Sequence, residues 1–156
     1  MAKGAGTTLL IAIVGTVIGC VIGFFVGLIQ TIPVNQNDSA GKKIVLKIVN
    51  IILKIYVEVF RGTPMIVQAM VFYYGAMSMF DIDMSPMFAG FLVVSINTGA
   101  YMAEIIRAGI QSVDKGQMEA ARSLGLPYWK ARQKVVLPPA IRTMIPSIIN
   151  QFIITL

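Results

Sequence analysis

Charged residues are missing from long stretches of this chain, and these stretches predict its architecture. No Asp, Glu, Lys or Arg occurs within residues 4–37, 62–80 or 84–103. Because about 20 apolar residues of helix cross the hydrocarbon core of a bilayer, each stretch is long enough to span a membrane. The pattern predicts membrane-spanning helices at about residues 7–32, 62–80 and 87–106.

A fourth uncharged stretch follows Arg142 and has 14 residues. A helix of that length rises about 21 Å, which is less than the hydrocarbon thickness of about 30 Å. We therefore expect residues 143–156 to form part of a fourth span, and we expect the chain to be C-terminally truncated. Residues 1–156 are expected to form one transmembrane domain of an all-α fold.

The charges between the spans predict their orientation. Asp81 and Asp83 lie in a short turn without Lys or Arg, whereas residues 107–142 hold seven Lys or Arg and two acidic residues. Since positively charged loops stay on the cytoplasmic side of a membrane, residues 112–138 are expected to be cytoplasmic. The same rule places residues 33–61 inside and the N-terminus outside. We expect a multi-pass membrane protein.

The segment before the second span is polar at first and then amphipathic. Residues 33–41 contain Pro, Asn, Asp and Ser and predict a loop. Residues 44–60 are mostly aliphatic but interrupted by lysines, which suits a helix at the membrane interface whose lysine stems reach the headgroups. The sequence Arg61-Gly62-Thr63-Pro64 then interrupts this helix.

Glycine recurs every four residues in the first predicted span. Gly15, Gly19, Gly23 and Gly27 therefore fall along one stripe of a helix. Because lipid offers no hydrophobic incentive for helices to associate, small residues matter by letting another helix approach closely. The stripe predicts helix packing, either against a second subunit or within the same subunit, and the sequence leaves both alternatives open.

Bulk composition narrows the class of protein further. Hydrophobic residues make up 56% of the chain and charged residues 13%, and the mean hydropathy is +0.78, which is unlike a soluble domain. Cationic loops at the cytoplasmic face account for the net charge of +6, so we expect no nucleic-acid partner. The chain has no histidine, and its single cysteine, Cys20, lies in an apolar run. We therefore expect no metal site, no disulfide and no catalytic residues.

The predicted cytoplasmic loop, residues 112–138, carries the signals of a short helix. Asp114 can accept hydrogen bonds from the free N–H groups of a helix that starts at Lys115, and Gln117 can complete a capping box. Gly125 can adopt the left-handed conformation that often follows a helix. We expect a first helix at Lys115–Leu124 and a tight turn after it.

A second short helix is expected after this turn. Pro127 suits its first turn, and Pro138-Pro139 is expected to prevent it from continuing past Val136. The exposed side of the two helices is expected to carry Glu119, Arg122, Lys130, Arg132 and Lys134, and the turn to carry Leu124, Leu126, Tyr128 and Trp129.

These features leave two interpretations of the loop. It is either a solvated basic linker whose aromatic residues anchor at the headgroups, or a rigid projection that inserts into a groove of a partner. The spacing of its residues favours the second interpretation: Glu119-Ala120-Ala121, three residues, Gly125, nine residues, Val135-Val136-Leu137-Pro138. This motif resembles the cytoplasmic coupling loop of the permeases of ABC importers.

The resemblance implies a fold, partners and a set of contact residues. The fold is the multi-span helical bundle of a type I importer permease, in which two permease subunits, identical or different, meet a dimer of cytoplasmic ATPases. An extracytoplasmic binding protein delivers the substrate. The residues implied to dock on the ATPase are Glu119, Ala120, Ala121, Arg122, Leu124 and Gly125.

No phosphate-binding pattern G-x-x-x-x-G-K-[ST] occurs in the sequence. ATP and Mg²⁺ are therefore expected on the partner subunit, and we expect neither a cofactor nor an enzymatic activity on this chain.

Two further segments look like those of polar amino-acid importers: Phe60–Pro64 with Gln68, and Asn97–Glu104. The resemblance covers nearly the whole chain and implies transport of polar or charged amino acids. For Glu104, an ion pair with Arg107 one helical turn later is a simpler alternative to a pathway role. The polar residues of the second and third spans that are candidates for the substrate pathway are Gln68, Asn97, Thr98 and Glu104.

Two other functions stay open. An ion-coupled secondary transporter or channel would need several ionisable residues inside the spans, and the predicted spans have almost none. A non-transporting scaffold whose basic loop recruits anionic lipid would carry an unstructured run of basic residues. The loop has helix caps, prolines and interspersed acids instead.

Overall fold

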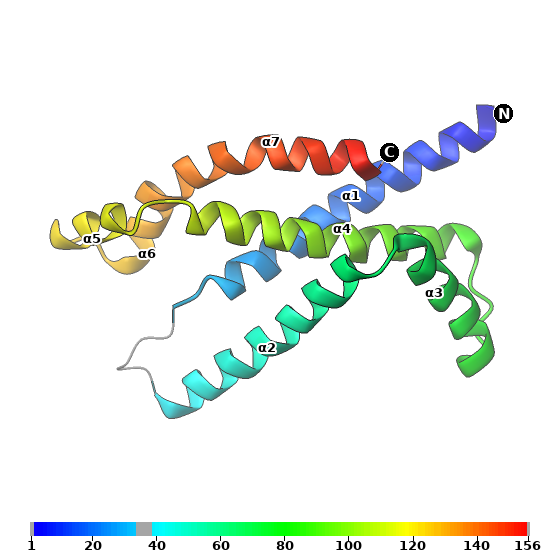
Figure 1. The fold of residues 1–156 in the computed structure, drawn as a ribbon, viewed down its shortest axis with the longest axis horizontal. Helices are drawn as coiled ribbons and strands as arrows, with labels where there is room; N and C mark the ends of the chain where they lie inside the picture. The colour runs from blue at the N-terminus through cyan, green and yellow to red at the C-terminus, as the bar shows by residue number, and fades with distance from the viewer. Residues whose placement is uncertain (1, 34–38, 156) are drawn as a thin grey trace.

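The computed structural model describes residues 2–33 and 39–155, and within these ranges the secondary structure is helical (Figure 1). The expected all-α fold is therefore confirmed for the described residues, whereas most of the predicted 33–41 loop lies outside them. The elements are α1 (Ala2–Gln30), α2 (Ala40–Gly62), α3 (Met65–Phe80), α4 (Pro86–Gln111), α5 (Lys115–Ser123), α6 (Tyr128–Ala131), the π-helical turn η1 (Arg132–Val136) and α7 (Leu137–Thr155).

The long uncharged stretches are helical, but the helices begin and end at residues that differ from the predicted span boundaries. Among the described residues, α1 and α4 have the length and apolar composition of membrane spans, and α3 is a shorter apolar helix. The second expected span begins at Met65 rather than at residue 62, because Thr63 and Pro64 separate α2 from α3 with extended backbone. A proline disfavours helical geometry at the residue before it, which explains the break at Thr63.

Helix α4 lies at the centre of the structure and packs against α1, α2, α3 and α7 (Figure 1). Its contact with α1 follows the glycine stripe. A β-carbon built on Gly15 would lie 2.5 Å from Cγ1 of Val94, and one on Gly19 would lie 2.7 Å from Cβ of Thr98. Only glycine therefore lets the two backbones come this close, and the stripe packs within one chain.

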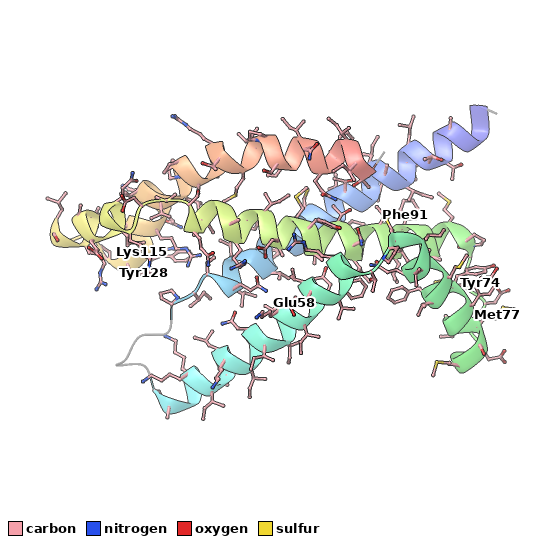
Figure 2. All side chains as sticks on the ribbon, in the orientation of Figure 1. Glu58, Tyr74, Met77, Phe91, Lys115 and Tyr128 are labelled. Atoms are coloured by element: carbon pink, nitrogen blue, oxygen red, sulfur yellow. The ribbon has the colours of Figure 1, made fainter. Side chains whose placement is uncertain are left out.

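The α2–α3 connection lies alongside α4, and the other connections lie toward the two ends of the molecule (Figure 1). The N-terminus and the α3–α4 turn lie at one end, whereas the end of α1, the start of α2, α5 and α6 lie at the other (Figure 1). Lys115 and Tyr128 mark the second end in Figure 2, and Tyr74 and Met77 of α3 mark the first. The start of α2 and the 112–138 loop thus lie at a shared end, and which end faces the cytoplasm stays a prediction.

The expected helix end at Pro138 is wrong. Helix α6 continues through η1 into α7, and the N–H of Leu137 donates to the carbonyl of Arg132, five residues earlier. In an α-helix the ring of Pro138 would clash with the carbonyl four residues before it, and the wider π-helical turn removes that clash. The second half of the loop is therefore continuous with α7.

Candidate functional site

Helix α5 is fixed at its N-terminal end by the residue expected to cap it. Oδ1 of Asp114 accepts a hydrogen bond from the N–H of Gly116 at 2.7 Å. This bond satisfies one of the free N–H groups of the first turn and places a negative charge at the positive end of the helix. The capping role predicted for Asp114 is therefore confirmed.

The C-terminal end of α5 forms a Schellman motif. The N–H of Leu126 donates to the carbonyl of Ala121 at 3.2 Å, and the N–H of Gly125 donates to the carbonyl of Arg122 at 3.0 Å. Gly125 has φ of +82°, the left-handed conformation that a residue with a β-carbon adopts at a cost. The predicted turn at Gly125 is confirmed, and hydrogen bonds define both ends of α5.

Five of the six residues implied to dock on a partner are exposed, and we call them the docking surface: Glu119, Ala120, Arg122, Leu124 and Gly125. The sixth, Ala121, is 4% exposed and belongs to the packing beneath the helix. Leu124 is 84% exposed and Trp129 is 60% exposed. An exposed leucine and tryptophan beside a rigid charged helix are typical of a surface that a partner covers.

Arg132 was expected on the exposed side of the loop, and that prediction is wrong. Its side chain is buried, with 4% exposed. It donates hydrogen bonds to the carbonyl of Thr31 at 3.2 Å, to the hydroxyl of Thr31 and to the hydroxyl of Tyr128 at 3.4 Å. The continuation of α6 into η1 turns Arg132 inward, toward the C-terminal end of α1.

Two pathway candidates meet at the break between α2 and α3. Nε2 of Gln68 and Nδ2 of Asn97 both donate to the carbonyl of Phe60 at 2.9 Å, and Nδ2 of Asn97 also lies 3.2 Å from Oε1 of Gln68. Both side chains are buried. They satisfy a carbonyl near the end of α2 that has lost its helical hydrogen-bond partner. The two side chains were expected to face a substrate, and here they also stabilise the helix break.

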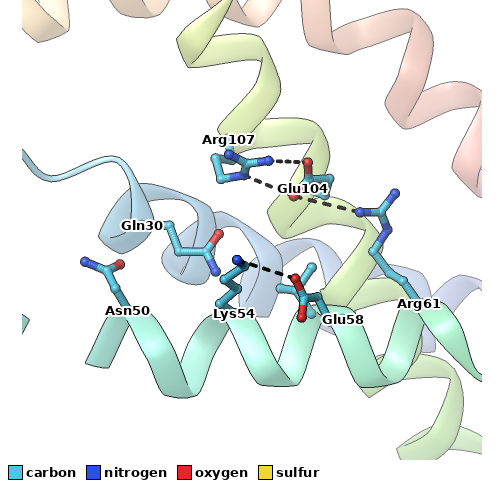
Figure 3. A pocket seen from close by; sticks show the side chains of 8 residues that line it. Gln30, Asn50, Lys54, Glu58, Arg61, Glu104 and Arg107 are labelled. Carbon is cyan, nitrogen blue, oxygen red and sulfur yellow. Dashed lines mark hydrogen bonds and ion pairs between the residues drawn. The ribbon is translucent and has the colours of Figure 1, made fainter. Parts of the chain in front are cut away.

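A cavity of about 440 Å³ lies between α1, α2 and α4, and we call it the α2 cavity (Figure 3). Glu104 lies in its wall, bonded to Arg107 at 2.5 and 3.0 Å and facing Arg61 at 3.8 Å. The ion pair with Arg107 expected from the i,i+3 spacing is therefore confirmed. On the α2 side, Lys54 faces Glu58 at 3.7 Å.

A second cavity of about 470 Å³, the helix-break cavity, opens beside the α2–α3 connection. Asn97 borders it, together with Tyr101 of α4 and Gln151 of α7. The guanidinium of Arg61 lies 5.4 Å from the centre of the Tyr101 ring, within the range of a cation–π contact. The cavity thus combines an aromatic face, a cation and side-chain amides.

The fourth pathway candidate, Thr98, is placed elsewhere. It is 1% exposed and packs against Gly19 in the seam between α1 and α4. It lines neither of the two cavities described above. The structure therefore brings Asn97 and Gln68 together, leaves Glu104 in a separate wall and uses Thr98 for packing.

The polar stripe of α2 escaped the sequence analysis. Most apolar residues of α2 are exposed, and its polar residues recur every three or four positions along the side that borders cavities. That spacing is visible in the sequence, but the lysines were assigned to the headgroup region. The cavity-facing residues are Lys43, Lys47, Asn50, Lys54, Glu58 and Arg61.

Among the residues that the structure describes, no group of three or more Cys, Asp or Glu comes together to hold an ion. The carboxylates of the α2 cavity face cations of the protein instead.

Comparisons with known proteins agree with this architecture. Over 151 residues, or 97% of its length, the chain is 35% identical to the arginine transport system permease protein of Bacillus subtilis (strain 168). Over 155 residues it is 37% identical to the glutamine transport system permease protein of Escherichia coli (strain K12). The chain spans slightly less than two thirds of the lengths of these relatives, 64% and 65%.

A solved structure shares the fold. A chain from the crystal structure of an amino acid ABC transporter with histidines superimposes with a TM-score of 0.81 and 36% identity, over 99% of this chain and 69% of that one. Residues 39–156 match the family described as binding-protein-dependent transport system inner membrane component. The resemblance to importer permeases is thereby confirmed, and this chain belongs to the family of binding-protein-dependent transport system inner membrane components.

Proposed function

We propose that this chain is part of the permease subunit of an ATP-driven ABC importer of polar or charged amino acids. Family membership and the glutamine and arginine transport permeases among its relatives support this function. The observation that carries it is α5, a helix with hydrogen-bonded caps at both ends that follows the apolar helix α4, with Leu124 exposed at its end.

The docking surface is proposed to bind a cytoplasmic ATPase dimer that holds ATP and Mg²⁺. Leu124 supplies apolar area for a groove, and Glu119 can pair with a basic residue of the partner. Because α5 connects to α4 on one side and to α6, η1 and α7 on the other, a displacement of the loop reaches both α4 and α7 through the backbone. This chain would supply the path and the coupling element, and the partner would supply the hydrolysis.

The proposed orientation puts the docking surface in the cytoplasm of a bacterium and the N-terminus outside. The positive charge of residues 107–142 supports it. The test uses a Cys20→Ala background with Asp83→Cys or Gln117→Cys and a membrane-impermeant thiol reagent. We expect labelling of intact cells at position 83 and protection at position 117. The reverse pattern would contradict the orientation.

The two cavities support a zwitterionic substrate. Asn97, Gln151 and Tyr101 offer dipoles to a passing amino acid, and transport needs binding weak enough for release. Glu104 is already paired with two arginines, so it offers no free carboxylate for ion coupling. This pairing favours the importer over an ion-coupled transporter. A second permease subunit would close the path, and an extracytoplasmic binding protein would select and deliver the amino acid.

The decisive experiment uses the complete protein with its ATPase, its second permease subunit and its binding protein in lipid vesicles. We expect the ATPase to copurify, and we expect ATP-dependent uptake of labelled glutamine or arginine. Glu119→Lys should abolish copurification, because it reverses a charge of the docking surface. Uptake of a sugar or metal without any amino acid, or association with anionic lipid without any ATPase, would contradict the proposal.

A further inference from the structure

Arg132 is a buried cation in a loop whose other basic residues are exposed. Among the described ion pairs none involves Arg132, and its partners are the neutral oxygens of Thr31 and Tyr128. Burying a guanidinium costs free energy unless its donors find acceptors. Three acceptor contacts from two segments 101 and 4 residues away therefore indicate a built site rather than a side chain turned in by chance.

The acceptors on α1 suit a cation. Thr31 follows the last residue of α1, and carbonyls at the C-terminal end of a helix carry partial negative charge without partners inside the helix. α1 has no basic residue in its own last turn. The hydroxyl of Thr31 donates to the carbonyl of Leu28 at 2.9 Å, which leaves its lone pairs for Arg132. Arg132 thus supplies from η1 the C-terminal charge that α1 lacks.

The contact between Arg132 and Thr31 adds a third connection between the 112–138 loop and the rest of the protein. The loop is joined to α4 and α7 through the backbone, but α1 is joined to it in space through Arg132 and Thr31. α1 is in turn packed tightly on α4 along the glycine stripe. We propose that Arg132 is a positioning residue that ties the docking loop to the end of α1, so that α1, α4 and the loop move as one body when the ATPase acts. The inference rests on the proposed function.

The test compares Arg132→Met with Lys134→Met in the complete transporter. Both variants remove one positive charge from η1, but Lys134 is exposed, so it serves as the matched control. For Arg132→Met we expect retained ATPase copurification and about a five- to tenfold fall in substrate-stimulated ATP hydrolysis, the size of an ordinary coupling effect between sites. For Lys134→Met we expect wild-type stimulation. Stimulated hydrolysis of Arg132→Lys should lie between those of the two Met variants, because an ammonium cannot reproduce the several N–H donors of a guanidinium.

A rescue separates positioning from mere folding. In a Cys20→Ala background, the double variant Thr31→Cys/Arg132→Cys should show low substrate-stimulated ATP hydrolysis. A short bifunctional maleimide that joins the two thiols should restore this hydrolysis. Recovery is expected only if the tie itself transmits movement. If Arg132→Met keeps full stimulation, or if the joined double variant stays uncoupled, the proposal is overturned.

A second measurement does not depend on transport. Amide hydrogen exchange of residues 115–131 in the purified complete protein should be faster in Arg132→Met than in Lys134→Met, because the loop loses its tie to α1. Equal exchange in the two variants would overturn the tie. If neither the wild type nor Lys134→Met shows stimulated hydrolysis, the proposed function fails, while the exchange experiment still decides whether Arg132 holds the loop.

Discussion

Helices are held together in different ways in two regions: the seam between α1 and α4, and the 112–138 loop at the end of α4. In the seam, Gly15, Gly19, Gly23 and Gly27 remove side chains so that two backbones touch. In the loop, hydrogen bonds at Asp114 and Gly125 and the buried Arg132 fix short helices. The seam relies on shape, and the loop relies on directed polar contacts.

The difference follows from the solvent around each region. Lipid gives apolar surfaces no reason to associate, so a seam inside the bilayer must gain its stability from close contact. Water competes for backbone hydrogen bonds, so a short helix outside the bilayer needs caps to persist. We therefore expect the seam to be destabilised most by larger side chains, and the loop to be destabilised most by residues that disfavour its backbone conformation.

The largest effect is expected for Gly23→Leu in the seam. A β-carbon there would lie 2.8 Å from the amide nitrogen of Ala103 and 2.8 Å from the carbonyl of Gly99, and backbone atoms cannot move aside. We expect a loss of about 3 kcal/mol or more and little folded protein in a thermal denaturation series in detergent. Gly6→Leu is the control, because a β-carbon at Gly6 meets nothing within 4 Å. Equal melting temperatures would show that the seam tolerates separation.

The next effect is expected for Gly125→Val in the loop. The φ of +82° suits glycine, and a β-branched side chain there costs about 1–2 kcal/mol or more. Substrate-stimulated ATP hydrolysis and uptake by the complete transporter should both fall, whereas the amount inserted in the membrane should not change. Gly125→Asn should keep much of the activity, because asparagine tolerates the left-handed region. Normal turnover of the valine variant would show that the turn does not transmit movement.

An effect of similar size is expected for Asn97→Leu at the break between α2 and α3. The variant removes one donor to the Phe60 carbonyl and the partner of Gln68 Oε1, and a buried polar group left unpaired costs about 1–3 kcal/mol. Thermal denaturation measures the loss. Thr143→Val serves as the comparison, because that exposed hydroxyl bonds along its own helix. A variant as stable as the wild type would mean that water or a substrate group replaces the amide.

The smallest effect is expected for Lys54→Met on the polar stripe of α2. Its pair with Glu58 spans 3.7 Å, and both side chains are largely exposed, so in a wet cavity the pair contributes about 0.5 kcal/mol or less. A melting temperature close to that of the wild type is the expected result. A large loss would show that Glu58 faces lipid, where an unpaired carboxylate is costly.

Local patterns were sufficient for the elements that depend on neighbours in the sequence. The uncharged stretches predicted α1, α3 and α4, and Asp114 and Gly125 predicted both ends of α5. Helix caps and hydropathy act over a few residues, which is why the sequence shows them. The Glu104–Arg107 pair was predicted for the same reason, since the two residues lie one turn apart.

The differences between prediction and structure arose where a local rule did not settle the outcome. Pro138 was expected to end a helix, but the π-helical turn before it lets the helix continue into α7. The sequence analysis also missed that Gln68 and Asn97 both donate to the carbonyl of Phe60, 8 and 37 residues away, and their role in the substrate path stays a prediction. Pro64 has no N–H, so the sequence does show that the Phe60 carbonyl loses its helical partner, but it does not show which side chains replace that partner.

The sequence by itself determined that this chain spans a membrane, that it presents a capped basic loop and that glycine lines one face of its first helix. Each of these depends on composition or on spacing along one helix. Only the tertiary structure decided that the glycine face meets α4 and that Arg132 turns inward to Thr31. Both contacts join residues far apart in the chain, and their geometry follows from how whole helices pack rather than from the preference of any one residue.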